Sequence, residues 1–311
     1  METIKNCPLC NSNSTIKLYS NEVRFQSDTN DPNVAFRNFF LDHVLQTHSL
    51  ISQFRLCLSC SFMFFYPRLT QREMDRLYGP DYLTNIQKYS PSFGEEAGDP
   101  INPPMHRAIM IKEIVSNYGN SEVKKILDYG GANGFNLRAF TGSLNKYVLD
   151  PSVTKPLPNV NLISAIDEMA PYDLIICTHV LEHLVQPREI WDGLLTNLRE
   201  GGLLYIEVPY DFPTTIRLQL GLGDFEHINF FNKTALLKIA HASNLTRLYS
   251  GIRTYLMGTS ESNQWEMIVN CALFQKNSVI GTNIRHQYFS SLLFESAEYI
   301  LLNKVLSRRN Y

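Results

Sequence analysis

Short runs of hydrophobic residues recur through the middle of the chain, and polar segments with helical spacing or turn residues separate them. A helix is expected to begin near Gly134. A second helix is expected from Pro187 to about Glu200, with Gly201 and Gly202 ending it, because proline is tolerated in the first turn of a helix. Each run is short enough for a buried strand. The strands predicted in this part are Lys125–Tyr129, Lys146–Leu149, Asn159–Ser164, Asp173–Cys177 and Leu203–Val208.

The same alternation continues toward the C-terminus. Asn232 is placed to cap a helix that runs through His241, and two further strands are predicted over Thr246–Gly251 and Trp265–Phe274. Strands that alternate with helices are typical of an α/β protein with helices on both faces of a mostly parallel sheet. The predicted fold class is therefore a doubly wound, mostly parallel, seven-stranded α/β sheet with a small N-terminal module.

The remaining segments suggest a domain division. Residues 90–104 are rich in proline, glycine and acidic residues, which is typical of a linker or of a loop over an active site. Residues 283–311 carry apolar side chains at helical spacing, so we expect a tail helix that packs on its own domain or forms a homodimer contact. The predicted division is residues 1–89 for an N-terminal zinc-binding module, 90–105 for a linker, 106–276 for the main domain and 277–311 for a helical tail.

Charge and hydropathy exclude several classes of function. The chain has 28 basic and 30 acidic residues, a net charge of −2, and no run of lysine or arginine. It therefore has no overall attraction to nucleic acid or to an anionic membrane. The first residues do not form a signal peptide, and no apolar run approaches the ~20 residues that span a bilayer. A cytoplasmic protein without a membrane partner is expected.

Four of the six cysteines form two C-x2-C pairs, Cys7 with Cys10 and Cys57 with Cys60. Two such pairs can complete a tetrahedral zinc site, which leaves no open position and is therefore structural. The 46 residues between the pairs must fold so that the pairs meet. His43 and His48 in this insert are alternative ligands. Unrelated buried cysteines are the other interpretation, and we expect that for Cys177 and Cys271.

A glycine-containing loop, Asp128 to Gly134, follows the first strand of the main domain. Gly130, Gly131 and Gly134 allow sharp turns and a close approach of ligand to backbone. Ala132 stands where a dinucleotide-binding loop would have its second glycine, so a nicotinamide dehydrogenase is disfavoured. Asp128, two residues before the first glycine, suits a cofactor with a positively charged amino-acid end.

Two further carboxylates follow predicted strands. Asp150 ends the second strand and can accept hydrogen bonds from both hydroxyls of a ribose. Asp167 follows the third strand, where an adenine amino group would lie. Ligands of open α/β sheets bind beyond the carboxyl ends of the strands. A solvated turn residue before Pro151 is the alternative interpretation of Asp150.

With these motifs the chain resembles the class I S-adenosylmethionine-dependent methyltransferases. The resemblance rests on ILDYGGANG, YVLDPS, DLIICTHVLEHL and LREGGLLYIEVP and covers residues 124–276. It implies S-adenosylmethionine as cofactor and a seven-stranded sheet of that family's type. The cofactor-binding residues that it implies are Asp128, Tyr129, Gly130, Gly131, Gly134, Asp150, Pro151, Asp167, Thr178 and His179.

A narrower resemblance is to bacterial methyltransferases with an N-terminal zinc module, including the sugar C-methyltransferases. The stretch CLSCSFMFFYPRLTQREMDRLYGPDYL carries it. In those enzymes a Tyr, a Glu and a His follow the fifth strand, and this chain offers Phe225, Glu226 and His227. Phe225 lacks the tyrosine hydroxyl, and the sequence stops soon after Phe274, whereas those enzymes carry a large C-terminal domain. The resemblance therefore leaves C-methylation open beside O-methylation.

His227 is the predicted general base, with Glu226 as its orienting partner or as a substrate ligand. An imidazole accepts a proton near neutral pH. The segment that carries the pair follows a strand that ends at the ligand-binding edge. The alternative is that the pair only anchors this segment, and His179 and His183 are rival bases.

The predicted function is therefore methyl transfer from S-adenosylmethionine to a small molecule, a sugar or nucleotide-linked sugar, at oxygen or carbon. An RNA methyltransferase with a zinc finger and a non-catalytic cofactor-binding module are the alternatives. Salt-dependent binding to RNA would favour the first, and failure to bind S-adenosylmethionine would favour the second. The identity of the methyl acceptor stays open.

Overall fold

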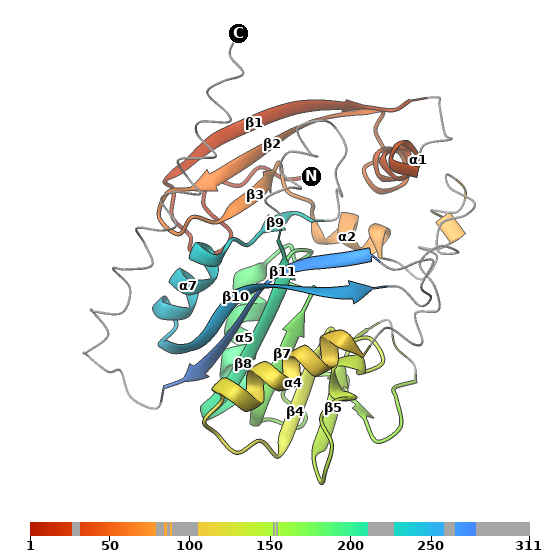
Figure 1. Cartoon of the computed structure of the whole chain (residues 1–311). Coiled ribbons are helices and arrows are strands. Elements are labelled where there is room, and N and C mark those ends of the chain that lie inside the picture. The colour runs from red at the N-terminus through yellow and green to blue at the C-terminus, as the bar shows by residue number, and fades with distance from the viewer. Residues whose placement is uncertain are drawn as a thin grey trace. The chain divides into compact units, whose positions relative to one another are not determined.

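The computed structural model describes most of the chain (Figure 1). Residues Met1–Lys276 form one compact unit. The predicted tail helix and the predicted linker, apart from Met105, lie outside the described residues. The ranges described are 1–26, 32–78, 84–85, 88, 105–151, 153, 155–210, 227–257 and 265–277.

The larger sheet has seven strands in the order β10-β11-β8-β7-β4-β5-β6. All pairings from β8 to β6 are parallel, whereas β11 runs antiparallel to both of its neighbours. The mostly parallel, seven-stranded sheet expected from the sequence is confirmed. Its strands are β4 (Lys125–Tyr129), β5 (Asn145–Leu149), β6 (Asn161–Leu162), β7 (Tyr172–Thr178), β8 (Leu198–Pro209), β10 (Leu245–Met257) and β11 (Trp265–Lys276).

Helices cover both faces of this sheet because alternate side chains of its central strands point to opposite faces. On one face Ile126, Leu174 and Leu203 pack with Ile111 of α4 (His106–Tyr118). The opposite face packs against α5 (Pro187–Asn197) and α7 (Lys233–Ala242). Asn232 caps α7 through its side-chain oxygen, which accepts from the backbone N–H of Ala235, as expected from the sequence.

Two boundaries differ from the sequence-based expectation. Gly134 has a φ of +86°, outside the helical region, and only a 3-10 turn, η2 (Phe135–Leu137), follows it. The helix predicted there is therefore wrong. In addition, α5 ends at Asn197, and Leu198 already pairs with Tyr172 of β7. The pairing with a neighbouring strand extends the chain before the two glycines that were expected to stop the helix.

A smaller antiparallel sheet, in the order β1-β2-β3-β9, contains the N-terminal residues. Its strands are β1 (Thr15–Arg24), β2 (Ser49–Cys57), β3 (Met63–Tyr66) and β9 (Asn229–Phe230). Helix α1 (Pro32–Phe39) and the π-helical turn η1 (Phe40–Val44) connect β1 to β2, and α2 (Gln71–Leu77) follows β3. The strand β9 lies between β8 and α7 in the sequence. The chain therefore leaves the large sheet after β8, adds β9 to the small sheet and returns to the large sheet at β10.

The described residues contain no helix that is both long enough and apolar enough to cross a membrane.

Candidate functional site

The carboxyl ends of the parallel strands bring most of the predicted site residues to one edge of the large sheet. The glycine loop follows β4, Asp150 follows β5, and His179 follows β7. The order of the strands reverses between β4 and β7, because the chain adds β5 and β6 on one side before it returns to add β7 on the other. Open α/β sheets bind ligands at such a reversal.

The glycine loop has no room for side chains at its turn. Gly130 has a φ of +66°, and a Cβ atom there would lie 2.3 Å from Cγ2 of Val180. A Cβ atom on Gly131 would lie 2.1 Å from Cγ of Asp128. Asp150 supports the loop from β5, since its Oδ2 accepts from the backbone N–H of Ala132 at 2.9 Å. The loop therefore presents bare backbone at the edge of the sheet.

Asp128 lies buried beneath this loop and does not reach solvent. Its Oδ1 accepts a hydrogen bond of 3.0 Å from Nδ2 of Asn136, which also donates to Oγ1 of Thr178. Arg107 in turn donates from Nε to Oδ1 of Asn136 at 2.9 Å. Burial raises the pKa of Asp128 to about 6, although Asn136 and Arg107 act in the opposite direction.

Sequence reasoning did not single out Arg107 or Asn136. Arg107 lies just after the predicted linker, and Asn136 lies in the segment predicted to be helical. Neither has a local signal that distinguishes it from an ordinary polar residue. Their positions in the site follow from the packing of α4 beside η2.

The other predicted cofactor residues lie along the same edge with different exposure. Tyr129 is half-buried, and burial raises its pKa to about 12. Thr178 is buried, whereas Pro151 is exposed after β5. Asp167 is exposed in the turn that follows β6.

His179 lies between two buried carboxylates. Its φ is +54°, in the left-handed region. Nδ1 lies 3.3 Å from Oε1 of Glu182, and Nε2 lies 3.2 Å from Oε1 of Glu207. Nε2 also lies 2.8 Å from the hydroxyl of Tyr255, which donates to Glu207. Burial alone would lower the pKa of His179, but the two carboxylates raise it to about 9. The two carboxylates therefore favour the protonated form of His179, which does not suit the role of a base.

Glu182, His183 and His227 form a second polar cluster beside His179. One ligand atom from each of the three side chains lies within 4.8 Å of the other two. The imidazole rings of His183 and His227 are 4.8 Å apart between centroids. Nδ1 of His183 is 2.8 Å from the hydroxyl of Tyr78, which follows α2. The predicted base and one of its rivals are thus direct neighbours, whereas Glu226 lies outside the described residues.

Arg68 holds together the two segments that carry these histidines. Arg68 is 1% exposed. Nη2 donates to the carbonyl oxygens of Leu184 and Val185, at 3.1 and 2.8 Å, just after His183. It also donates to Oδ1 of Asn229 at 2.9 Å, and Nη1 donates to the carbonyl oxygen of Ile228 at 3.4 Å. The N-terminal residues therefore take part in positioning the cluster.

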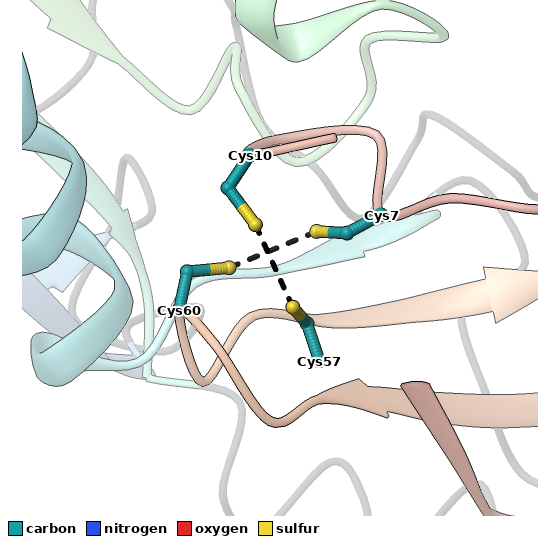
Figure 2. A group of neighbouring side chains, drawn as sticks. All are labelled: Cys7, Cys10, Cys57 and Cys60. Carbon is teal, nitrogen blue, oxygen red and sulfur yellow. Dashed lines mark hydrogen bonds between the residues drawn. The ribbon is translucent and has the colours of Figure 1, made fainter. Parts of the chain in front are cut away.

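The four paired cysteines also meet at one point. Figure 2 shows their sulfurs facing one another, with Cys7 opposite Cys60 and Cys10 opposite Cys57. The sulfur–sulfur distances of these two pairs are 3.7 and 3.6 Å. The antiparallel pairing of Thr15 with Cys57 brings the two C-x2-C units together.

The other candidate ligands and cysteines lie elsewhere. His43 stacks on Phe39, and His48 packs edge-on against Phe25, so neither belongs to the cysteine cluster. Cys177 and Cys271 are buried in the large sheet, as the sequence predicts.

The central part of the chain matches a known protein family. Residues 105–249 match the family model described as "Methyltransferase domain" (Methyltransf_23). No curated protein sequence matches the chain.

Several solved structures are similar over part of the chain. The N-methyltransferase NodS from Bradyrhizobium japonicum WM9 is 17% identical, with 55% of this chain and 94% of that chain covered and a TM-score of 0.39. Magnesium protoporphyrin IX methyltransferase (ChlM) from Synechocystis PCC 6803, with bound S-adenosylhomocysteine, is 12% identical, with 55% and 82% covered and a TM-score of 0.39. The plantazolicin methyltransferase BpumL, in complex with S-adenosylhomocysteine, is 13% identical, with 67% and 99% covered and a TM-score of 0.42.

The family match covers β4, the glycine loop and the strands on both sides of the reversal. The strand order, with one antiparallel strand next to β8, agrees with it. The protein therefore contains a class I methyltransferase domain and is an S-adenosylmethionine-dependent methyltransferase.

Proposed function

We propose that this methyltransferase transfers the methyl group of S-adenosylmethionine to a sugar or nucleotide-linked sugar, at oxygen or carbon. The observation that carries the proposal is the contact between the glycine loop and the turn after β7. The side chain of Val180 fills the space beside Gly130, and His183 follows in the same turn. The loop that binds the cofactor and the histidine cluster are thus adjacent, and a polar acceptor fits a cluster of imidazole, carboxylate and phenol groups.

The cofactor fits the edge of the sheet in the following way. The bare backbone of Gly130 and Gly131 is proposed to face the methionine portion. Both positions require glycine, because a side chain there would meet Val180 or Asp128. Asp150 accepts from the ribose hydroxyls while its Oδ2 also supports the loop. Tyr129, Gly134, Pro151, Asp167, Thr178 and His179 complete the proposed cofactor-binding set, together with Asp128 beneath the loop.

For a hydroxyl acceptor, His227 is the proposed proton acceptor, and Glu226 is proposed to orient it or to bind the substrate. The acceptor oxygen forms a bond to the methyl carbon while the carbon–sulfur bond breaks. The electron pair of that bond stays on sulfur, which becomes the neutral thioether of S-adenosylhomocysteine. The acceptor proton passes to the imidazole of His227. General-base catalysis of this kind contributes ~10²–10⁴-fold.

Zinc fits the cysteine cluster. Zn–S bonds of ~2.3 Å in a tetrahedral site place sulfur atoms ~3.8 Å apart. The observed separations of 3.7 and 3.6 Å agree with that geometry. Four thiolates fill the coordination sphere, so the proposed zinc is structural and holds the N-terminal segment against β2. Asn232 donates to the carbonyl oxygen of Ser61 at 2.8 Å, which connects this zinc site to the start of α7.

The proposal is tested by calorimetry with S-adenosylmethionine, followed by a screen for methyl transfer to nucleotide-linked sugars. We expect one cofactor per chain and S-adenosylhomocysteine released only when the acceptor is present. Variant His227→Ala should lower turnover by at least ~10²-fold and leave cofactor affinity nearly unchanged. Methyl transfer to RNA with strongly salt-dependent binding, and none to sugars, would refute the proposed acceptor.

A further inference from the structure

Three side chains of types that can bind a metal meet outside the cysteine cluster, beside the proposed acceptor site. Oε1 of Glu182 and Nε2 of His183 are 3.8 Å apart. One ligand atom of each residue of the set Glu182, His183 and His227 lies within 4.8 Å of the others. Ligand bonds of ~2.0–2.2 Å keep ligand atoms ~3–4 Å apart, so small side-chain rotations close this site around an ion. We propose that Glu182, His183 and His227 bind a divalent cation that holds the methyl acceptor.

The first argument is the burial of Glu182. Its side chain is 1% exposed. Neither carboxylate oxygen accepts a hydrogen bond from any residue that the structure describes. His179 lies 3.3 Å from Oε1, not aligned as a hydrogen bond, and it is shared with Glu207 on its other side. A buried carboxylate that lacks hydrogen bonds is costly. A bound cation would supply the missing ligand bonds and remove that cost.

The second argument is the orientation of His183. Its Nδ1 lies 2.8 Å from the hydroxyl of Tyr78. With the Nδ1 proton donated to this hydroxyl, Nε2 carries the lone pair of the ring, and it lies 3.8 Å from Oε1 of Glu182. A histidine that binds a metal usually has its other ring nitrogen held by such an outer hydrogen bond, which fixes the tautomer. Tyr78 therefore has the position of an orienting residue for a metal ligand.

The ligand set indicates which ions would bind. One carboxylate and two imidazoles suit manganese, iron, cobalt, nickel or zinc, whereas four thiolates select zinc. The two proposed sites also differ in openness. Four cysteines close a tetrahedral site, but three protein ligands leave coordination positions for oxygen atoms of a substrate.

This inference rests on the proposed methyl transfer to a sugar and specifies how the acceptor is held. A divalent cation held by these residues would lower the pKa of a bound hydroxyl and so favour the loss of its proton. The proton leaves to solvent, the oxygen attacks the methyl carbon, and the electron pair of the carbon–sulfur bond stays on sulfur. Two neighbouring hydroxyls of a sugar would chelate the cation and fix one oxygen toward the methyl group. His227 then serves as a metal ligand instead of the proton acceptor, and metal dependence distinguishes these two roles.

The test uses Mn²⁺ as the probe on full-length, zinc-loaded protein, without cofactor or acceptor. Electron paramagnetic resonance measures free Mn²⁺ during a titration. We expect about one Mn²⁺ per chain. Mn²⁺ prefers oxygen and nitrogen ligands, so it does not displace zinc from the thiolates. Glu182→Gln and His183→Ala should each abolish this binding, and Tyr78→Phe should weaken it by ~10–100-fold. His241→Ala, an exposed histidine at the end of α7, is the matched control and should bind Mn²⁺ normally.

Zinc content and S-adenosylmethionine affinity verify that each variant is folded. Wild-type protein that binds no Mn²⁺, or binding that persists in both Glu182→Gln and His183→Ala, would overturn the inference. Full methyl transfer to a sugar in buffer freed of divalent cations would also overturn it, while the proposed function would stand. Mn²⁺ binding that is lost in both variants, without methyl transfer to any sugar, would support the cation site and refute the proposed acceptor.

Discussion

Arg68 provides a sharp test of how the N-terminal residues support the site. Its buried guanidinium donates to four acceptors in two segments, the turn after His183 and the segment that begins β9. Variant Arg68→Met keeps a long apolar side chain but removes every donor. Arg68→Lys keeps the charge, but a single ammonium group cannot span both segments. Arg72→Met, an exposed arginine in α2, is the matched control.

The expected magnitude follows from the bonds that are lost. Hydrogen bonds to a charged group contribute ~1.5–3 kcal/mol each, and a stranded buried acceptor costs ~1–3 kcal/mol. Three of the four bonds of Arg68 are 3.1 Å or shorter. These contributions overlap, because the acceptors relax together and water enters. We therefore expect Arg68→Met to lower the free energy of unfolding by about 3–5 kcal/mol, Arg68→Lys by less, and Arg72→Met by less than ~0.5 kcal/mol.

Urea unfolding measures these differences, and hydrogen exchange locates them. The amides of Ile228 and Asn229 donate to the carbonyl oxygen of Glu182 at 3.0 and 3.1 Å. They should exchange faster in Arg68→Met, because the two segments then separate more easily. A loss of less than ~1 kcal/mol, with both amides still protected, would refute the conclusion that Arg68 holds the histidine segments together.

Three further predictions concern the cofactor, the pH dependence of stability and the metal. Asp150→Ala should weaken S-adenosylmethionine binding by about 2–3 kcal/mol in calorimetry, since a charged acceptor of ribose hydroxyls is lost. Unchanged affinity would show that Asp150 does not bind the cofactor. The folded pKa of Asp128, about 6, exceeds its ordinary value of 3.8, so its contribution to stability is present below about pH 4 and is lost as pH rises through 6. Unfolding experiments should therefore show that Asp128→Asn becomes more stable relative to the wild type between pH 4 and 7, and a constant difference would contradict this. Cys57→Ser should release about one zinc per chain and destabilise the N-terminal segment; purified wild-type protein without zinc by metal analysis would exclude the proposed site.

The sequence alone determined much of the large sheet. The apolar runs at β4, β5 and β7 lie within a residue or two of their predicted positions, because burial on both faces of a parallel strand requires continuous apolar residues. The cap of α7 at Asn232 is equally local. The two C-x2-C pairs and the glycine loop could also be recognised from the sequence, because each is a short segment whose residue types restrict its backbone or its ligands.

Only the tertiary structure decided how the histidine cluster is built. The contact of Arg68 with Val185 joins residues 117 positions apart, and that of Tyr78 with His183 joins residues 105 positions apart. Side-chain periodicity reports which face of one element is buried, not which distant element covers it. The sequence therefore identified His227 as a candidate, but its neighbours Glu182 and His183 lie beside it because Ile228 and Asn229 donate to the carbonyl oxygen of Glu182.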